Sequence, residues 1–177
     1  YGTDALRFAL VREVAGAGQD IRLDYDRKKD PSATVEASRN FANKLWNATR
    51  FALMNLGGET PDQLGDPDLA ALQLADRWIL SRLARVNRET AERYSNYGLG
   101  EAAKGLYEFA WNDVCDWYLE LSKRRLNPGE NASAEALTDQ RVAKQVLAKV
   151  ISQMHLMLHP LMPPLTEELW HSVTGEP

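Results

Sequence analysis

Apolar residues recur every three or four positions along most of the chain, the spacing of helices that bury one face. The pattern predicts a first helix over about residues 3–14 and a short last one through Trp170. Between them it predicts four longer helices. The first of these should run from soon after Pro31 to about Leu56, and the other three over about residues 68–94, 100–126 and 138–158.

Glycines and prolines separate these helices, and most connections are short, as in helical bundles. Alternating apolar side chains at Ile21, Leu23 and Tyr25 predict one short extended segment. No regular alternation of strands and helices follows it. We therefore expect an all-α fold, an antiparallel helical bundle with a short N-terminal linker segment.

The helix that follows Pro31 has a distinctive polar face. Its apolar face carries Phe41, Leu45, Ala48 and Ala52, and a stripe roughly opposite carries Arg39, Asn43, Asn47 and Arg50. No acidic residue occurs from Arg39 to Met54, although a solvated face usually mixes Glu with Lys. Arginine and asparagine are planar donors suited to phosphates and base edges, which favours nucleic-acid binding. The alternative is a hydrogen-bond network between helices, and periodicity alone does not separate the two.

Two other groups of basic residues can be explained without nucleic-acid binding. Lys123, Arg124 and Arg125 close the helix predicted over residues 100–126. They could contact an RNA backbone, but a helix C-terminus favours cations in any case. Arg82, Arg85 and Arg88 share a helix side with glutamates, so a solvated face is the better interpretation there.

Composition narrows the class of protein. The 177 residues are 44% hydrophobic, enough for a sizeable core, and no apolar run approaches the roughly 18 residues that would span a membrane. The net charge of −4 argues against bulk electrostatic binding of nucleic acid but leaves room for a local basic surface. The single cysteine, Cys115, fits a reducing cytoplasm and is expected in the core.

The constellations typical of catalysis are absent from the sequence. His155 and His159 have the i, i+4 spacing of a metal-binding pair, but a structural role at the end of an apolar helix is favoured. Asp113 and Asp116 could be catalytic carboxylates, although pairing with an arginine or capping is the stronger expectation. We predict no catalytic residue and no metal site in this chain.

Five stretches together resemble the valyl-tRNA synthetase family. They are YGTDALRF from Tyr1, RNFANKLWNATRF from Arg39, DRWILSRL from Asp76, WNDVCDWYLELSK from Trp111 and LHPLMPPLTEELW from Leu158. They occur in the family's order and cover nearly the whole chain. The last is shared with isoleucyl and leucyl enzymes, whereas the Asn-Lys-Leu-Trp-Asn-Ala and Cys-Asp-Trp-Tyr sequences are more particular to the valine enzyme.

The resemblance implies a piece of a class I synthetase that follows the catalytic domain. Residues 1–30 would form a stem-contact-like linker, and residues 31–177 the helical anticodon-binding domain. The family's His-x-Gly-His and Lys-Met-Ser-Lys-Ser signatures do not occur here. The parent enzyme would attach valine to its tRNA using ATP with magnesium, while this piece would need no cofactor and would hold the tRNA.

The implied partners are the anticodon arm of valine tRNA and the catalytic domain of the same chain, in a monomeric enzyme. The residues that we expect to contact tRNA are Arg39, Asn43, Lys44, Asn47, Arg50, Lys123, Arg124 and Arg125. Two other functions stay open on the residues alone. One is a helical protein-interaction module, which the acidic pI of about 5.4 would suit. The other is an enzyme domain of unrecognised chemistry.

Overall fold

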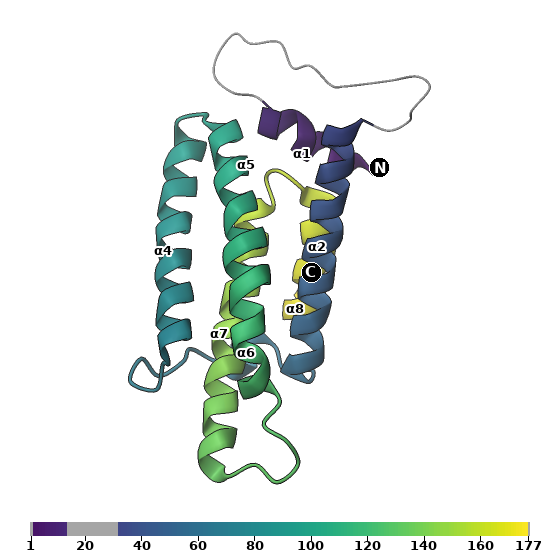
Figure 1. Ribbon diagram of the computed structural model, residues 1–177. Helices are drawn as coiled ribbons and strands as arrows, with labels where there is room; N and C mark the ends of the chain where they lie inside the picture. Colours follow the sequence, from purple (N-terminus) through teal and green to yellow (C-terminus); the bar gives the residue numbers. More distant parts are fainter. Residues whose placement is uncertain (1, 14–31, 177) are drawn as a thin grey trace.

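A computed structural model describes residues 2–13 and 32–176, and every regular element in those ranges is helical (Figure 1). The all-α prediction is thus confirmed, while the extended segment predicted near Ile21 lies outside the described residues. The elements are α1 (Thr3–Glu13), α2 (Ala33–Leu56), α3 (Pro61–Leu64), α4 (Leu74–Ser95), α5 (Leu99–Glu108), the π-helix η1 (Phe109–Tyr118), α6 (Leu119–Leu126), α7 (Ala134–Leu158) and α8 (Pro163–Thr174).

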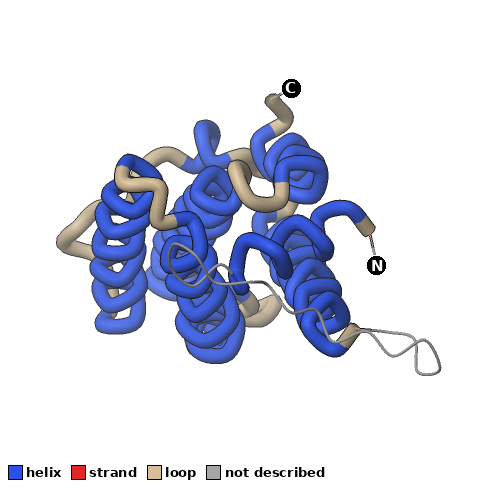
Figure 2. The backbone as a smooth tube through the Cα atoms, turned by 90° about the horizontal axis from the view of Figure 1, so that it is seen from above, coloured by secondary structure: helices blue, strands red, loops and turns tan. Residues whose placement is uncertain are grey.

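The long helices form a bundle in which α5, η1 and α6 make one continuous rod. This rod stands between α4 and α2, with α7 behind the rod and α8 behind α2 (Figure 1). Seen from above, the helices gather side by side with loops only at their ends (Figure 2). Helix α7 packs against α4, α6, α2 and α8, so it is the central element of the bundle.

One large apolar core joins these helices. Fully buried residues come from every long helix, for example Phe41 on α2, Ile79 on α4, Leu106 on α5 and Ile151 on α7. Helix α1 takes part as well, because the Phe8 ring is buried with its centre 4.9 Å from that of Phe41. The predicted linker region therefore contains a helix that packs into the core of the bundle.

Two helix boundaries differ from the sequence prediction because of local capping. Helix α4 begins at Leu74 rather than near Asp68, since the Gln73 backbone N–H donates to the Asp76 carboxylate in a capping box. The segment predicted as an exposed connection contains the short helix α3. Its signal was present in the sequence, because Thr60 and Gln63 form a capping box around Pro61 at the first helical turn.

The π-helix η1 changes which residues are buried in the second half of the rod. In η1 the hydrogen bonds span five residues, as when Leu119 donates its backbone N–H to the Val114 carbonyl. The sequence pattern of the helix expected over residues 100–126 predicts Trp117 and Leu121 on its apolar face, in line with Val114. That prediction is wrong, because the wider hydrogen-bond spacing buries Tyr118 and leaves Trp117 62% exposed and Leu121 52% exposed.

Candidate nucleic-acid interface

The polar face predicted on α2 lies on the outside of the bundle. Phe41, Leu45 and Ala52 are buried on the opposite face, which fixes the orientation of the helix. Asn43, Asn47 and Arg50 are exposed, and the Arg39 side chain is 44% exposed. These four residues, called here the α2 stripe, extend for about 16 Å at about 1.5 Å per residue. The alternative of an asparagine network inside the bundle does not hold for Asn43 and Asn47, because both face solvent.

Arg39 begins the stripe in an ion pair on its own helix. Its Nη2 lies 3.2 Å from a carboxylate oxygen of Glu36, one turn earlier, and the two side chains are similarly exposed. Such an exposed pair contributes less than about 1 kcal/mol to stability.

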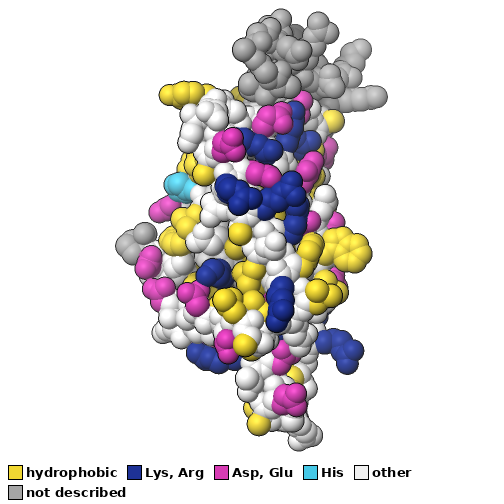
Figure 3. Space-filling view, turned by 90° about the vertical axis from the view of Figure 1, so that its left-hand side faces the viewer, with side chains coloured by type: hydrophobic (Ala, Val, Ile, Leu, Met, Phe, Trp, Pro, Cys, Tyr) yellow, Lys and Arg dark blue, Asp and Glu magenta, His cyan; other side chains and the backbone are white. Residues whose placement is uncertain are grey.

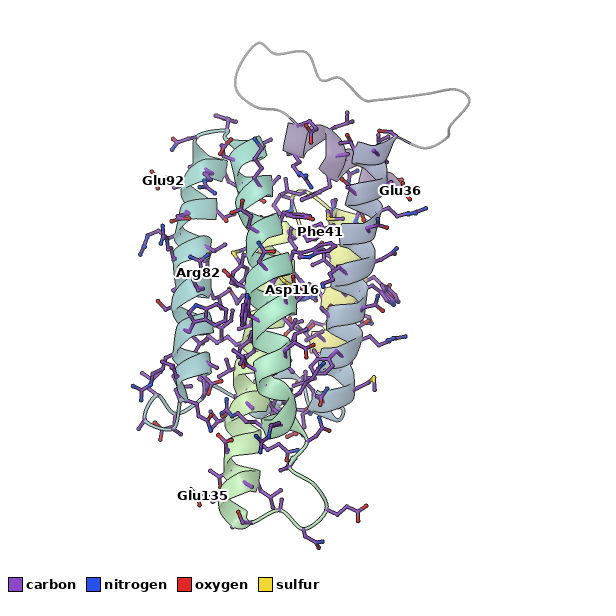
Figure 4. All side chains as sticks on the ribbon, viewed as in Figure 1. Glu36, Phe41, Arg82, Glu92, Asp116 and Glu135 are labelled. Atoms are coloured by element: carbon purple, nitrogen blue, oxygen red, sulfur yellow. The ribbon has the colours of Figure 1, made fainter. Side chains whose placement is uncertain are left out.

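Lys44 lies at the boundary between α2 and η1 rather than in the open stripe. Its Nζ is 2.8 Å from Oδ1 of Asp116 and 4.8 Å from the centre of the Trp111 ring. The Trp111 ring stacks on Tyr107 at 5.5 Å between centres, and the Arg12 guanidinium lies 4.7 Å over Tyr107. Two stacked rings thus lie between a cation of α1 and a cation of α2, and the contacts with Trp111 and Asp116 position Lys44. Figure 4 shows Asp116 on the side of the central rod that faces α2.

Lys123 and Arg124 are exposed at the C-terminal end of α6. Lys123 Nζ lies 2.6 Å from a Glu120 oxygen in an exposed pair. This end of α6 is close to the end of α2, because Asn127 Nδ2 donates to Oδ1 of the Asn55 side chain at 3.0 Å. Asn55 follows Arg39 by about 24 Å along α2. The two predicted clusters therefore lie on neighbouring helices, with Lys123 and Arg124 near the Arg50 end of the stripe.

Arg125 has a different environment from its two neighbours. Its side chain is only 10% exposed, and it donates hydrogen bonds of 2.8 Å to Asp76, on α4, and to Asp139, on α7. Burial disfavours its charge, but these hydrogen bonds to Asp139 and Asp76 outweigh burial and raise the pKa of Arg125. We call this group the Arg125 network; its members are Gln73, Asp76, Tyr118, Arg125 and Asp139. It joins α4, η1, α6 and α7.

The arginines of α4 are paired with carboxylates on another face. Figure 3 views that face and shows Lys and Arg side chains mixed with Asp and Glu. Arg82 Nε lies 2.8 Å from Asp113, and Arg85 Nε lies 2.7 Å from Glu89. The interpretation of this side as a solvated, ion-paired face agrees with these contacts, and Asp113 pairs with an arginine as expected.

Comparison with known proteins identifies the family. A model of the anticodon-binding domain of tRNA ligases matches residues 76–177. The chain belongs to this family. It is 94% identical over 176 residues to a valine–tRNA ligase of Parasynechococcus marenigrum, covering 99% of this chain and 19% of that protein. It is 80% identical over its whole length to a valine–tRNA ligase of Prochlorococcus marinus strain MIT 9313, covering 19% of it. A third such enzyme, from Thermosynechococcus vestitus, is 62% identical over 173 residues, which are 98% of this chain and 18% of that protein.

The matches confirm the family resemblance drawn from the sequence motifs, and they also define its extent. The chain spans about a fifth of the length of the curated relatives. The family model begins at Asp76, a member of the Arg125 network, whereas the α2 stripe lies before the matched region. Nevertheless α2 packs against α7, α8 and η1, all of which lie inside the match. The stripe and the matched helices therefore share one core.

Histidine and cysteine side chains of this anticodon-binding domain have structural contacts. His155 is buried, with Nε2 3.0 Å from the Thr49 hydroxyl, and burial lowers its pKa to about 4. Cys115 is buried as predicted, and burial raises the pKa of its thiol to about 11. Across residues 2–13 and 32–176, no group of three or more His, Cys, Asp or Glu could hold a metal. No helix among those residues is long and apolar enough to cross a membrane.

Two exposed tryptophans were not among the predicted site residues. Trp46 is 47% exposed and lies on α2 among the candidate residues, and Trp117 is 62% exposed on η1, which leads into α6. A helical wheel of α2 places Trp46 beside Arg39 and Arg50, so the sequence contained that signal. No regular α-helical wheel finds Trp117, because the π-helix brings it to the surface.

Proposed function

We propose that this chain is the anticodon-binding region of a valine–tRNA ligase and that it binds the anticodon arm of valine tRNA. The observation that carries the proposal is family membership combined with the exposed α2 stripe. The named function of the relatives supports valine as the amino acid. The stripe supplies the guanidinium and amide groups that RNA recognition uses.

The proposed interface uses α2 as its centre and the end of α6 as its flank. Arg39 and Arg50 would contact phosphates or stack on bases, while Asn43 and Asn47 would bind base edges. Lys123 and Arg124 would contact the backbone farther along. Trp117 and Trp46 offer stacking surfaces for unpaired bases, which an anticodon loop provides. Arg125 is assigned a structural part, because its donors are occupied by two carboxylates.

We propose the same division of the chain that the motifs indicate. Residues 1–30 would connect to a catalytic domain, and residues 31–177 would form the anticodon-binding domain. The contact between Phe8 and Phe41 would then transmit the position of the linker to α2. Activation of valine with ATP and magnesium would take place in the catalytic domain of the full-length enzyme, which we expect to be a cytoplasmic monomer.

The test is to substitute the stripe in the full-length enzyme. Arg39→Ala and Arg50→Ala should each weaken recognition of valine tRNA by about 1 to 3 kcal/mol if they contact bases, and by less if they contact phosphate alone. Valine-dependent pyrophosphate exchange should stay at the parent level. Arg85→Ala is the matched control, because Arg85 is an exposed, ion-paired arginine on α4. Aminoacylation efficiency with valine tRNA and with an anticodon-changed tRNA is the measurement. Unchanged efficiency and discrimination in both stripe variants would refute the proposal.

A further inference from the structure

The α2 stripe is bordered by a carboxylate from another helix. Asp116 lies on η1, 72 residues from Lys44 along the chain, and its Oδ1 is 2.8 Å from Lys44 Nζ. The Asp116 side chain is 45% exposed and that of Lys44 is 32% exposed. This carboxylate is therefore accessible at the edge of a surface that otherwise presents arginine and asparagine. A carboxylate repels phosphate, so Asp116 would weaken a surface that only binds phosphate.

Asp116 is held through Lys44, which is itself held by an aromatic ring. Lys44 contacts both Asp116 and the face of the Trp111 ring, so the cation cannot leave without losing two interactions. Trp111 is in turn stacked on Tyr107. The π-helix contains both Trp111 and Asp116, and its geometry directs Asp116 toward α2. A carboxylate held in this way is preorganised, which favours a specific contact over a general electrostatic one.

An ionised carboxylate only accepts hydrogen bonds. In nucleic-acid recognition it pairs with amino and imino N–H groups of bases and is repelled by phosphate. It also neutralises Lys44, the cation that would otherwise attract any phosphate to this point. The Asp116–Lys44 pair therefore disfavours RNA bound with a phosphate at this point, and it favours RNA that places a base N–H donor there.

We propose that Asp116 is a specificity-determining residue that accepts a hydrogen bond from an exposed base of the bound RNA, with Lys44 positioning its carboxylate. This inference rests on the proposed function and adds which chemical feature of the loop is selected. Arg39 and Arg50 supply affinity along α2, and the Asp116–Lys44 pair supplies discrimination at its edge. Lys44 is thus a positioning residue rather than a free phosphate contact.

The test uses Asp116→Asn in the full-length enzyme, a change that removes the charge and keeps the shape. Dissociation constants are measured for valine tRNA and for transcripts in which single anticodon-loop bases exchange N–H donors for acceptors. The parent should prefer the donor-bearing base at one position by about tenfold. Asp116→Asn should lose most of that preference, and it should bind unrelated tRNA more tightly as Lys44 is released. Asp113→Asn is the matched control, since Asp113 pairs with Arg82 on the α4 side.

A second variant separates recognition from structure. Lys44→Met keeps the carboxylate but frees it, so it should reduce the base preference less than Asp116→Asn does. If Asp116→Asn changes affinity for every tRNA by the same factor, or changes only the melting temperature, the inference is wrong. Arg50→Ala shows whether a negative result refutes only this inference or also the proposed function. Weaker binding by Arg50→Ala with unaltered discrimination by Asp116→Asn refutes this inference alone, whereas no effect from either variant refutes the proposed function.

Discussion

Arg125 on α6 and Arg50 on α2 lie on neighbouring helices, but they differ in burial and in hydrogen-bond partners. Arg125 is nearly buried between two carboxylates, one of which, Asp76, is completely buried. Arg50 is exposed on a stripe with no carboxylate on its own helix after Glu36. The first arginine already uses its donors within the fold, and the second has donors to offer a ligand. The residue type is the same, but packing determines the role.

The two sites should also differ in how much folding stability is lost when their residues are substituted. A buried charge pair contributes little net stability compared with apolar residues, but removing one member leaves an uncompensated charge. An exposed arginine can be removed with almost no effect on folding. Stability measurements should therefore respond to the Arg125 network, and RNA binding should respond to the α2 stripe.

The largest effect is expected from Arg125→Met. This change leaves the buried Asp76 carboxylate with only the Gln73 N–H and Tyr118 hydroxyl as partners. The free energy of unfolding should fall by about 3 to 5 kcal/mol, measured by urea denaturation. Arg124→Met, one position earlier and exposed, is the matched control and should change it by less than about 0.5 kcal/mol.

A double variant sharpens the same measurement. Asp76→Asn together with Arg125→Met removes both charges of the buried Asp76–Arg125 pair and leaves only the more exposed Asp139, so it should lose less stability than Arg125→Met alone. If the single variant is as stable as the parent, then Arg125 is not a structural residue. It would then return to the set of tRNA contacts predicted from the sequence.

The two tryptophans of η1 test whether the π-helix sets the boundary between core and surface. Trp111 is half-buried against Phe41 and Tyr107, so Trp111→Ala should cost about 2 to 4 kcal/mol. Trp117 is largely exposed, and Trp117→Ala should cost less than about 0.5 kcal/mol. Thermal or urea unfolding of both variants is the measurement. Equal losses would mean that η1 is a regular α-helix in solution, with Trp117 in the core.

His155 extends the comparison to a buried polar group without an ion pair. Burial lowers its pKa to about 4, against about 6.5 in an unfolded chain. Between these values the unfolded chain binds a proton that the folded chain does not. This contribution to stability is therefore complete above about pH 6.5 and is lost as the pH falls toward 4. From pH 7 to pH 5 the loss should be about 2 kcal/mol.

His155→Gln isolates this titration from that of the carboxylates. The Gln amide can still donate to the Thr49 hydroxyl, which itself donates to the Leu45 carbonyl. Denaturation curves at pH 7 and pH 5 should show a smaller loss for the variant than for the parent. The same loss in both proteins would mean that His155 does not titrate differently in the folded state.

Much of this fold could be predicted from the sequence because most helices keep a regular 3.6-residue period. The apolar face of α2 and the end of that helix at Gly57, with φ of 67°, both follow from local residues. The face of the rod beyond Val114 could not be predicted in the same way. A π-helix is a property of tertiary packing, and it moved Trp117 and Leu121 to the surface without any change in composition.

In the candidate site, too, local periodicity predicts some features and long-range contacts decide the others. The exposure of Asn43, Asn47 and Arg50 follows from the helical period alone. The partners of Lys44 and Arg125 do not, because Asp116 and Asp76 are 72 and 49 residues away in the sequence. Sequence patterns identify which cations exist, but long-range pairing decides which of them have free donors.

The smallest effect concerns the flank of the proposed interface, at Lys123 and Arg124. If each contacts one phosphate of the bound tRNA, its replacement by alanine should reduce the slope of log Kd against log salt concentration by about 1 or somewhat less. Lys123→Ala should have the weaker effect, because Lys123 is paired with Glu120 at 2.6 Å and must lose that contact on binding. Discrimination between anticodons should not change, since phosphate contacts carry no direct sequence information. The measurement is valine tRNA binding by the full-length enzyme over a salt series, with Arg85→Ala as the reference. An unchanged slope in both variants would confine the interface to α2 and η1, and would leave the end of α6 with only the stabilisation that cations give a helix C-terminus.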